Sequence, residues 1–409
     1  MPSRAGGRTP IAGNAGAGAP GPAAVTGIRS SPIGKEEGYV AAEFGENLAG
    51  IPMYKLSSDP HRCIVFADRE EDAGRVAATE RGLSAETKAL LIAIGSADVD
   101  PTLLPEDLKT KATAGPGAGG TSFFLCSGSH RVRLSLNPAS PLKVVPWRDG
   151  VAVTKEGNII ATGTFERPLC HCPRQAYVTV SERCIYDCKF CPVPLLGGHV
   201  KTIGEIVGLV EVAIRSGDVT AISLTSGVAE SPEKEVAYIV EVVKALKRRF
   251  DLPIGVSVYP TATSSEELFA AGASEIKYNV ETMDPAIFTR VCPGLSLDDI
   301  IAALTHAVEV FGRNRVSSNF IIGIGESDAC VEEGVGRLTG LGVIPNLRPI
   351  SAHPLRKGQI EVDRPSAYRL LRLARITKAA LERNGLSVLT AKTMCLPCTG
   401  CDLVPQRDV

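Results

Sequence analysis

Residues 176–191 read AYVTVSERCIYDCKFC, and this stretch predicts both a fold and a chemistry. Its first part, 176–181, is a strand-like run rich in β-branched and aromatic residues. Cys184, Cys188 and Cys191 follow at once in a C-x3-C-x2-C spacing. An iron–sulfur cluster normally takes four cysteines, so a loop with three leaves one iron open for a ligand from outside the chain. Zinc is the alternative, but zinc motifs usually come as two distant cysteine pairs.

The regular alternation of strand and helix patterns after this loop predicts an α/β fold. Strands alternating with helical patterns indicate parallel pairing with right-handed crossovers. Six such units favour an open (β/α)6 partial TIM-type barrel with its active site at the carboxyl ends of the strands. Ser264 with Glu267, and Ser296 with Asp299, predict two helix starts. The five later strand-like runs are 220–226, 254–259, 275–280, 316–324 and 343–350.

Composition divides the chain into four expected parts. Residues 1–38 are rich in Gly, Ala and Pro and predict a disordered tail. Residues 39–165 predict a small mixed α+β accessory region, with a helix at Ser84–Ala93 and short strands after it. Residues 166–385 form the predicted barrel, and 386–409 a cysteine-rich carboxyl-terminal tail.

The same composition excludes several classes of protein. Lys and Arg number 44 against 45 Asp and Glu, so no basic field indicates nucleic acid. There is no apolar run of about 18 residues, which argues against a membrane span. The amino-terminal segment lacks the apolar core of a secretory signal, so we expect a cytoplasmic protein.

Twelve cysteines are present, and eight of them fall in two tight groups. Large cytoplasmic proteins keep their thiols reduced, so thiols clustered at such short gaps indicate metal rather than disulfides. Packed, isolated thiols are expected at the four remaining positions. These are Cys63, Cys126, Cys292 and Cys330.

The first cysteine loop resembles the radical S-adenosylmethionine (SAM) superfamily, whose signature is C-x3-C-x-aromatic-C after the first barrel strand. Phe190 supplies the aromatic residue, which in that family lies near the adenine of SAM. The resemblance implies a [4Fe-4S] cluster whose open iron is chelated by SAM. An electron from the cluster then cleaves SAM, and the resulting 5′-deoxyadenosyl radical abstracts hydrogen from the substrate.

Later motifs resemble the biotin synthase and lipoyl synthase branch, and in particular the biotin-synthase-related radical SAM proteins of archaea and anaerobes. The resemblance covers about residues 165–405 and implies SAM contacts at the strand ends; a β-turn at 225–227 and a surface position for Arg348 are the alternatives. We expect His353 to be a satisfied loop histidine. The implied SAM contacts are Thr225, Ser226, Gly227, Asn279, Glu281, Gly323, Gly325, Glu326 and Arg348.

A second cysteine group, Cys395, Cys398 and Cys401, has a C-x2-C-x2-C spacing. It predicts an auxiliary iron–sulfur cluster, with Cys170 or Cys172 as a fourth ligand if the tail folds back. A small zinc knot is the alternative.

Three functions are open at this stage. The first is a radical SAM enzyme that inserts sulfur, like a lipoyl or biotin synthase, using the auxiliary cluster. The second is a radical SAM enzyme for rearrangement, methylation or carbon–carbon chemistry in a cofactor pathway of an anaerobe. The third is a non-catalytic zinc or iron–sulfur protein. The enzymes need a reductant such as ferredoxin or flavodoxin, a small-molecule or carrier-bound acyl substrate and, by resemblance, a partner radical SAM enzyme. The catalytic residues are not predicted.

Overall fold

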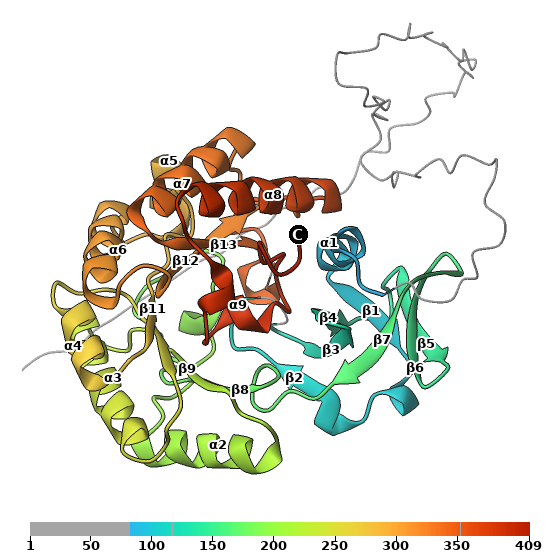
Figure 1. The fold of residues 1–409 in the computed structure, drawn as a ribbon, viewed down its shortest axis with the longest axis horizontal. Coiled ribbons are helices and arrows are strands. Elements are labelled where there is room, and N and C mark those ends of the chain that lie inside the picture. Colours follow the sequence, from blue (N-terminus) through green and yellow to red (C-terminus); the bar gives the residue numbers. More distant parts are fainter. Residues whose placement is uncertain (1–81, 116–117, 352) are drawn as a thin grey trace, which may run out of the picture. The chain divides into compact units, whose positions relative to one another are not determined.

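A computed structural model describes residues 82–115, 118–351 and 353–409, which belong to one compact unit. The predictions for the 1–38 tail and for Cys63 lie outside the described residues. Two sheets organise the rest: a six-stranded parallel sheet wrapped by helices and a seven-stranded mixed sheet (Figure 1). Among the described residues, no helix has the length and apolar character that crossing a bilayer requires.

The six-stranded sheet is the predicted partial barrel. Its strands pair in chain order, so β8 and β13 form its two edges, and every pair is parallel. The strands are β8 (Gln175–Thr179), β9 (Ala221–Thr225), β10 (Ile254–Ser257), β11 (Glu275–Lys277), β12 (Val316–Ile322) and β13 (Ile344–Pro349). All six predicted strands are confirmed, although several end earlier than the apolar runs suggested.

Helices cover the outer face of this sheet (Figure 1). They are α2 (Ile203–Ser216), α3 (Pro232–Lys247), α4 (Ser264–Ala271), α5 (Pro285–Val291), α6 (Leu297–Phe311), α7 (Asp328–Leu341) and α8 (Ala367–Arg383). Ser296 caps α6 by accepting a hydrogen bond from the Asp299 amide at 3.2 Å, as predicted. The predicted capping box at Ser264 is wrong, because α4 already begins there. The Ser264 hydroxyl instead bonds the buried phenol of Tyr278 at 2.7 Å, a group that needs a partner.

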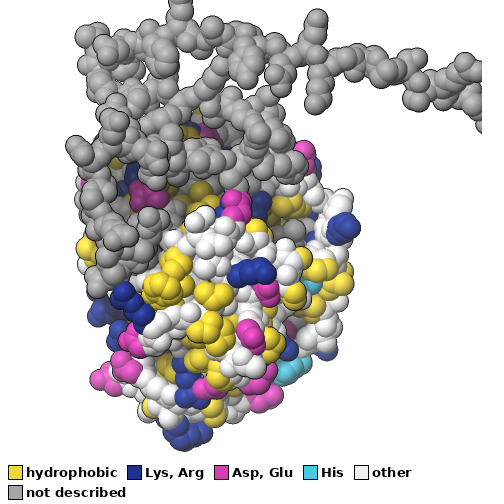
Figure 2. Space-filling model, turned by 90° about the vertical axis from the view of Figure 1, so that its right-hand side faces the viewer, with side chains coloured by type: hydrophobic (Ala, Val, Ile, Leu, Met, Phe, Trp, Pro, Cys, Tyr) yellow, Lys and Arg dark blue, Asp and Glu magenta, His cyan; other side chains and the backbone are white. Residues whose placement is uncertain are grey.

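The seven-stranded sheet, called the accessory sheet below, follows α1 (Ala85–Ile94). Its order is β2-β3-β4-β1-β5-β6-β7, and β3 also pairs with β7, so the sheet curls back on itself. Its strands are β1 (Ser96–Val99), β2 (Lys109–Lys111), β3 (Thr121–Ser127), β4 (His130–Leu136), β5 (Leu142–Trp147), β6 (Gly150–Lys155) and β7 (Asn158–Glu166). Leu370 and Ala374 of α8 pack into its core, which joins it to the barrel. On the face that Figure 2 shows, basic and acidic side chains are interspersed among apolar ones.

The carboxyl-terminal residues fold back toward the barrel interior. Glu275, at the start of β11, accepts hydrogen bonds from the amides of Lys392 and Thr393 at 2.7 and 2.9 Å. Gln175, at the start of β8, accepts one from the Met394 amide at 2.7 Å. The tail therefore enters from the amino ends of the strands. The short helix α9 (Cys395–Cys398) then lies between the barrel strands and the accessory sheet (Figure 1).

Candidate functional site

The first cysteine loop lies at the carboxyl end of β8 and is fixed by backbone hydrogen bonds to neighbouring segments. The Ile185 amide donates to the Val228 carbonyl, and the Lys189 amide donates to the Val291 carbonyl, both at 2.7 Å. Cys184, Cys188 and Cys191 are all partly buried free thiols. The loop is therefore ordered by contacts that do not use the cysteine side chains.

Arg356 clamps this loop from the other edge of the barrel. It ends the 3-10 helix η4 (Pro354–Arg356), which follows β13, and its side chain is only 3% exposed. Its Nε donates to the Cys191 carbonyl and its Nη1 to Asp187, each at 2.6 Å. Its Nη2 is buried without a partner among the described residues.

Two opposing effects act on the pKa values of the thiols of this loop. Burial raises the pKa of Cys184 and raises that of Cys191 to about 12. Backbone amides oppose this: those of Val228 and Tyr186 donate to Cys184 and favour its thiolate. Since metal ligands must be deprotonated, cluster binding here releases protons.

A further thiol, which sequence reasoning missed, reaches the same loop. Cys292 follows α5, is fully buried, and forms a hydrogen bond with Cys188 that raises the pKa of Cys292. The sequence predicted only a packed thiol, because nothing in its spacing connects it to Cys188. Four cysteines therefore gather at the carboxyl ends of the strands, three of them on one loop.

A cubane gives each thiolate its own iron, so the three cysteines can hold a cluster although they stand apart on one loop.

Thr225 ends β9, and Ser226 and Gly227 follow it next to the cysteine loop. The Ser226 hydroxyl accepts from the Ser181 amide at 3.0 Å and donates to Glu235, so its hydrogen-bonding capacity is largely used. A Cβ at Gly227 would lie 2.3 Å from the Arg183 carbonyl oxygen, so only glycine fits this approach. The structure thus gives this segment a role in supporting the loop, and its contact with SAM stays a prediction.

Asn279 and Glu281 lie beyond β11 and are hydrogen-bonded to each other, so their side chains lie together. Glu281 has a backbone φ of +58°, which is uncommon for a residue other than glycine. Burial raises the pKa of Glu281 to about 7, while Lys277 and Arg348 act in the opposite direction. Its charge also raises the pKa of Cys191, so Glu281 lies near the cysteine loop.

The G-x-G-E segment after β12 forms a tight turn. Gly323 has φ +104°, and a Cβ there would lie 2.2 Å from the Asp363 carbonyl oxygen. The Glu326 carboxylate accepts from the amides of Gly323 and Ile324 at 2.7 and 2.9 Å and pairs with Arg369. Glu326 therefore stabilises the turn. Gly325, in the same turn, has φ +107° and lies next to the Arg290 side chain of α5.

The three remaining predicted residues behave differently from one another. Arg348 is half-buried and pairs with Asp402 of the tail through Nε and Nη2, at 3.2 and 2.8 Å, and its contact with SAM stays a prediction. Phe190 is partly buried and packs against the barrel core. His353 accepts a hydrogen bond from the Leu355 amide at 3.2 Å and caps η4, as a satisfied loop histidine does.

The second cysteine group gathers four thiols. Cys172 is hydrogen-bonded to Cys398, and it feels the charges of Cys395 and Cys401. The hydrogen bond from Cys172 lowers the pKa of Cys398 to about 6. Cys170 instead lies against the Leu209 carbonyl of α2 at 4.0 Å. Of the two predicted fourth ligands, the structure brings Cys172 to the tail and leaves Cys170 apart.

Cations surround this second group, as they would an anionic cluster. The Lys277 ammonium donates to the Cys395 sulfur at 3.7 Å, and Arg131 donates to the Cys398 carbonyl at 2.8 Å. Burial raises the pKa of Cys401 to about 12, against the opposing effect of Arg133 and Arg348. Opposite charges nearby favour thiolates, which are the ligands of a cluster.

A six-stranded parallel barrel with a three-cysteine loop after its first strand is the frame of one protein class. Residues 178–337 match the Radical SAM superfamily, so this part of the chain is a radical SAM domain, as the sequence predicted. The assignment implies a [4Fe-4S] cluster and SAM.

Among curated proteins, the chain is 24% identical over 166 residues to the GTP 3′,8-cyclase of Mycobacterium sp. strain KMS and to that of strain JLS. The match covers 39% of this chain and 46% of each relative, so the chain spans about half the length of the curated relatives it matches. These relatives do not support the biotin and lipoyl synthase branch that the later motifs resembled.

Two solved structures give weak similarity. Methylornithine synthase aligns with a TM-score of 0.43 and 17% identity, over 50% of this chain and 62% of that one. A radical SAM methyltransferase from Sphaerobacter thermophilus aligns with a TM-score of 0.43 and 19% identity, over 64% of this chain and 70% of that one.

Proposed function

We propose that this protein is a radical SAM enzyme with two iron–sulfur clusters. The observation that carries the proposal is the loop of Cys184, Cys188 and Cys191 at the carboxyl end of β8, inside the matched domain and clamped by Arg356. When bound, the cluster held by these residues supplies the electron that cleaves SAM and releases a 5′-deoxyadenosyl radical. A reductant such as ferredoxin or flavodoxin provides that electron.

Within this proposal the chain's own residues position SAM and the substrate. Phe190 stands between two of the cysteine ligands and offers a ring to the adenine. Asn279 and Glu281 present polar groups beside Cys191, toward the ribose or the substrate. The glycines of the turn after β12 allow close backbone approach. Glu326 and Ser226 act through the turn and loop that they hold.

A second cluster is held by Cys172, Cys395, Cys398 and Cys401 in this proposal. The gathering of these four thiols among Lys277, Arg131 and Arg348 supports it.

For the reaction itself, we propose sulfur insertion into an acyl or cofactor precursor, with sulfide drawn from the second cluster. The similarity to GTP 3′,8-cyclase favours a second candidate, radical carbon-centred ring closure in which that cluster is not consumed. Labelled sulfide separates them: its transfer to product supports insertion, and its retention by the protein supports the second candidate.

The radical SAM proposal is tested with anaerobically reconstituted protein, dithionite and SAM. We expect 5′-deoxyadenosine from the wild type and from Cys330→Ser, a control thiol on α7, and none from Cys184→Ser or Cys191→Ser. Two cubanes predict about eight irons per chain, falling to about four when Cys395, Cys398 and Cys401 are all replaced by Ser. Absence of SAM cleavage by the fully iron-loaded wild type contradicts the proposal.

A further inference from the structure

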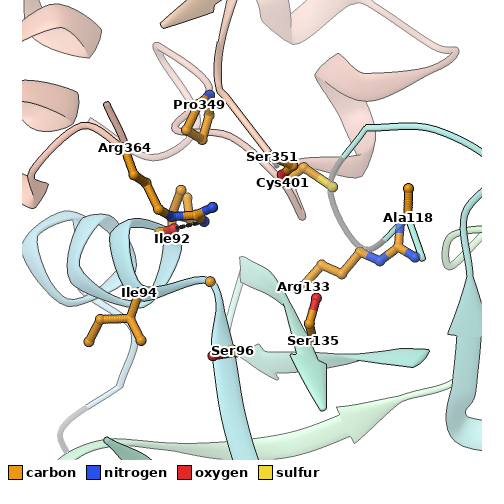
Figure 3. Close-up of a pocket in the computed structure, with 11 residues that line it drawn as sticks. Ile92, Ile94, Ser96, Ala118, Arg133, Ser135, Pro349, Ser351, Arg364 and Cys401 are labelled. Carbon is orange, nitrogen blue, oxygen red and sulfur yellow. Dashed lines mark hydrogen bonds between the residues drawn. The ribbon is translucent and has the colours of Figure 1, made fainter. Parts of the chain in front are cut away.

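We propose that a cavity between the accessory sheet and the end of β13 binds an anionic group, a carboxylate or a phosphate, of the substrate. The cavity has a volume of about 210 Å³ (Figure 3). It is lined by Arg133 and Ser135 of β4, Ser96 of β1, Arg364 before α8, and Cys401 of the tail. Three parts of the chain that lie far apart in sequence thus form one site.

Arg133 is the group that an anion would contact. It is 6% exposed, yet its Nε and Nη2 have no hydrogen-bond partner among the described residues. These two N–H groups form the edge of a guanidinium that binds a carboxylate or a phosphate in a bidentate manner. A buried donor without a partner is expensive, and an anion in the cavity would remove that cost.

The known neighbours of Arg133 do not satisfy this edge. Its Nη1 lies 3.3 Å from His171, whose pKa burial lowers to about 3, so that the ring is neutral at physiological pH. Its guanidinium also stands over the Phe124 ring at 5.8 Å. Cys398 and Cys401 feel its charge from the tail. None of these neighbours accepts a hydrogen bond from Nε or Nη2 of Arg133.

The rest of the cavity lining also favours a negatively charged ligand. Arg364 donates only to backbone carbonyls, those of Ile92, Ala93 and Ile350, so its charge also lacks an acidic partner. The hydroxyls of Ser96 and Ser135, which are register partners on β1 and β4, make no hydrogen bond to another described residue. No Asp or Glu among the described residues lines the cavity. Two cations and free hydroxyls favour an anion over a neutral ligand.

The location connects this site with the chemistry. Figure 3 shows Ser135 beside the Arg133 side chain on β4, with Cys401 of the tail across from them. Pro349, at the carboxyl end of β13, also lines the cavity. An anion held here would place the remainder of a substrate between the second cysteine group and the active end of the barrel. That role rests on the proposed function, whereas the binding itself does not.

The test measures melting temperature in inorganic phosphate, in acetate and in chloride at equal ionic strength, without SAM. The protein is the reconstituted full chain. Arg133→Gln removes the cation, and Ser135→Leu fills the cavity beside Arg133 while keeping the Arg133 charge. Arg174→Gln, an exposed arginine paired with Asp218, is the charge-matched control. Iron content and SAM cleavage are measured on the same samples.

We expect phosphate or acetate to raise the Tm of the wild type and of Arg174→Gln by about 2 °C at saturation, and neither to raise it in the two cavity variants. A response to phosphate alone assigns a phosphate ester, and a response to acetate alone assigns a carboxylate. No anion effect in the wild type, or an effect that survives in either cavity variant, overturns the inference. Protein that binds the anion but does not cleave SAM contradicts the proposed function instead.

Discussion

Arg356 donates a hydrogen bond from Nε to the backbone carbonyl of Cys191 over 2.6 Å. The two residues follow opposite edges of the open barrel, β13 and β8, so this bond joins the ends of the sheet above the strands. Asp187, within the same cysteine loop, accepts from Nη1. One guanidinium therefore fixes the loop at two points.

We expect the protein to retain its cluster less well when Arg356 is replaced. Arg356→Gln removes the charge-assisted bond to Asp187 and loosens the loop, at a cost of about 2 kcal/mol. We expect lower iron content after gel filtration and faster cluster loss in air. Iron and sulfide assays and the visible absorption of the cluster measure this.

The control for that variant is Arg174→Gln, whose exposed partner Asp218 lies away from the loop. It keeps full iron content. An Arg356→Gln protein that holds its iron as tightly as the wild type contradicts the clamp.

Cys170 and Cys172 give a matched pair for the second cluster. Cys172 is hydrogen-bonded to Cys398, while Cys170 points to α2. We therefore expect Cys172→Ser to lower the iron content toward four per chain and Cys170→Ser to leave it unchanged. Both variants should still cleave SAM, since the first loop is intact. Equal iron content in the two variants refutes the assignment of Cys172.

The sequence predicted the barrel well because strand runs and helix patterns repeat at regular intervals. It predicted the first cysteine loop because all three ligands lie within eight residues. It could not choose between Cys170 and Cys172, since that choice depends on which face of the segment meets a tail more than 220 residues away.

Other misses have the same cause. The pairing of Arg348 with Asp402 was not predicted, because only the folded tail brings the two residues together. Cys292 meets Cys188 through the packing of α5. The cavity next to Arg133 combines α1, β4 and the tail, and no local pattern connects these segments.

Glu281 predicts a pH dependence of stability in the metal-free, reduced protein. Burial raises its pKa from 4.5 to about 7, so the folded state binds this proton more tightly than the unfolded state does. Its contribution is fully present below about pH 4.5 and is lost as the pH rises to about 7. The loss amounts to about 3 kcal/mol at most.

Glu281→Gln tests this, because glutamine keeps the shape and the same φ but does not titrate. The stability difference between variant and wild type, from urea unfolding at about pH 5 and about pH 7.5, should move in favour of the variant at the higher pH. A difference that is constant across this range contradicts the raised pKa.

We expect a clear loss of stability from a change at Asp402. Its side chain is 2% exposed, pairs with Arg348 at 2.8 Å and accepts from Asn346 at 3.0 Å. Asp402→Asn leaves the half-buried Arg348 charge without its counter-charge, which costs about 2 kcal/mol. Replacing both partners together, Asp402→Leu with Arg348→Met, removes the orphan charge and should recover part of that loss.

Asp218→Asn, at an exposed pair, should leave the free energy of unfolding unchanged. Urea unfolding of the four proteins measures these differences. If Asp402→Asn unfolds at the same urea concentration as the wild type, the pair does not hold the tail in the barrel, and the position of the second cysteine group needs another explanation.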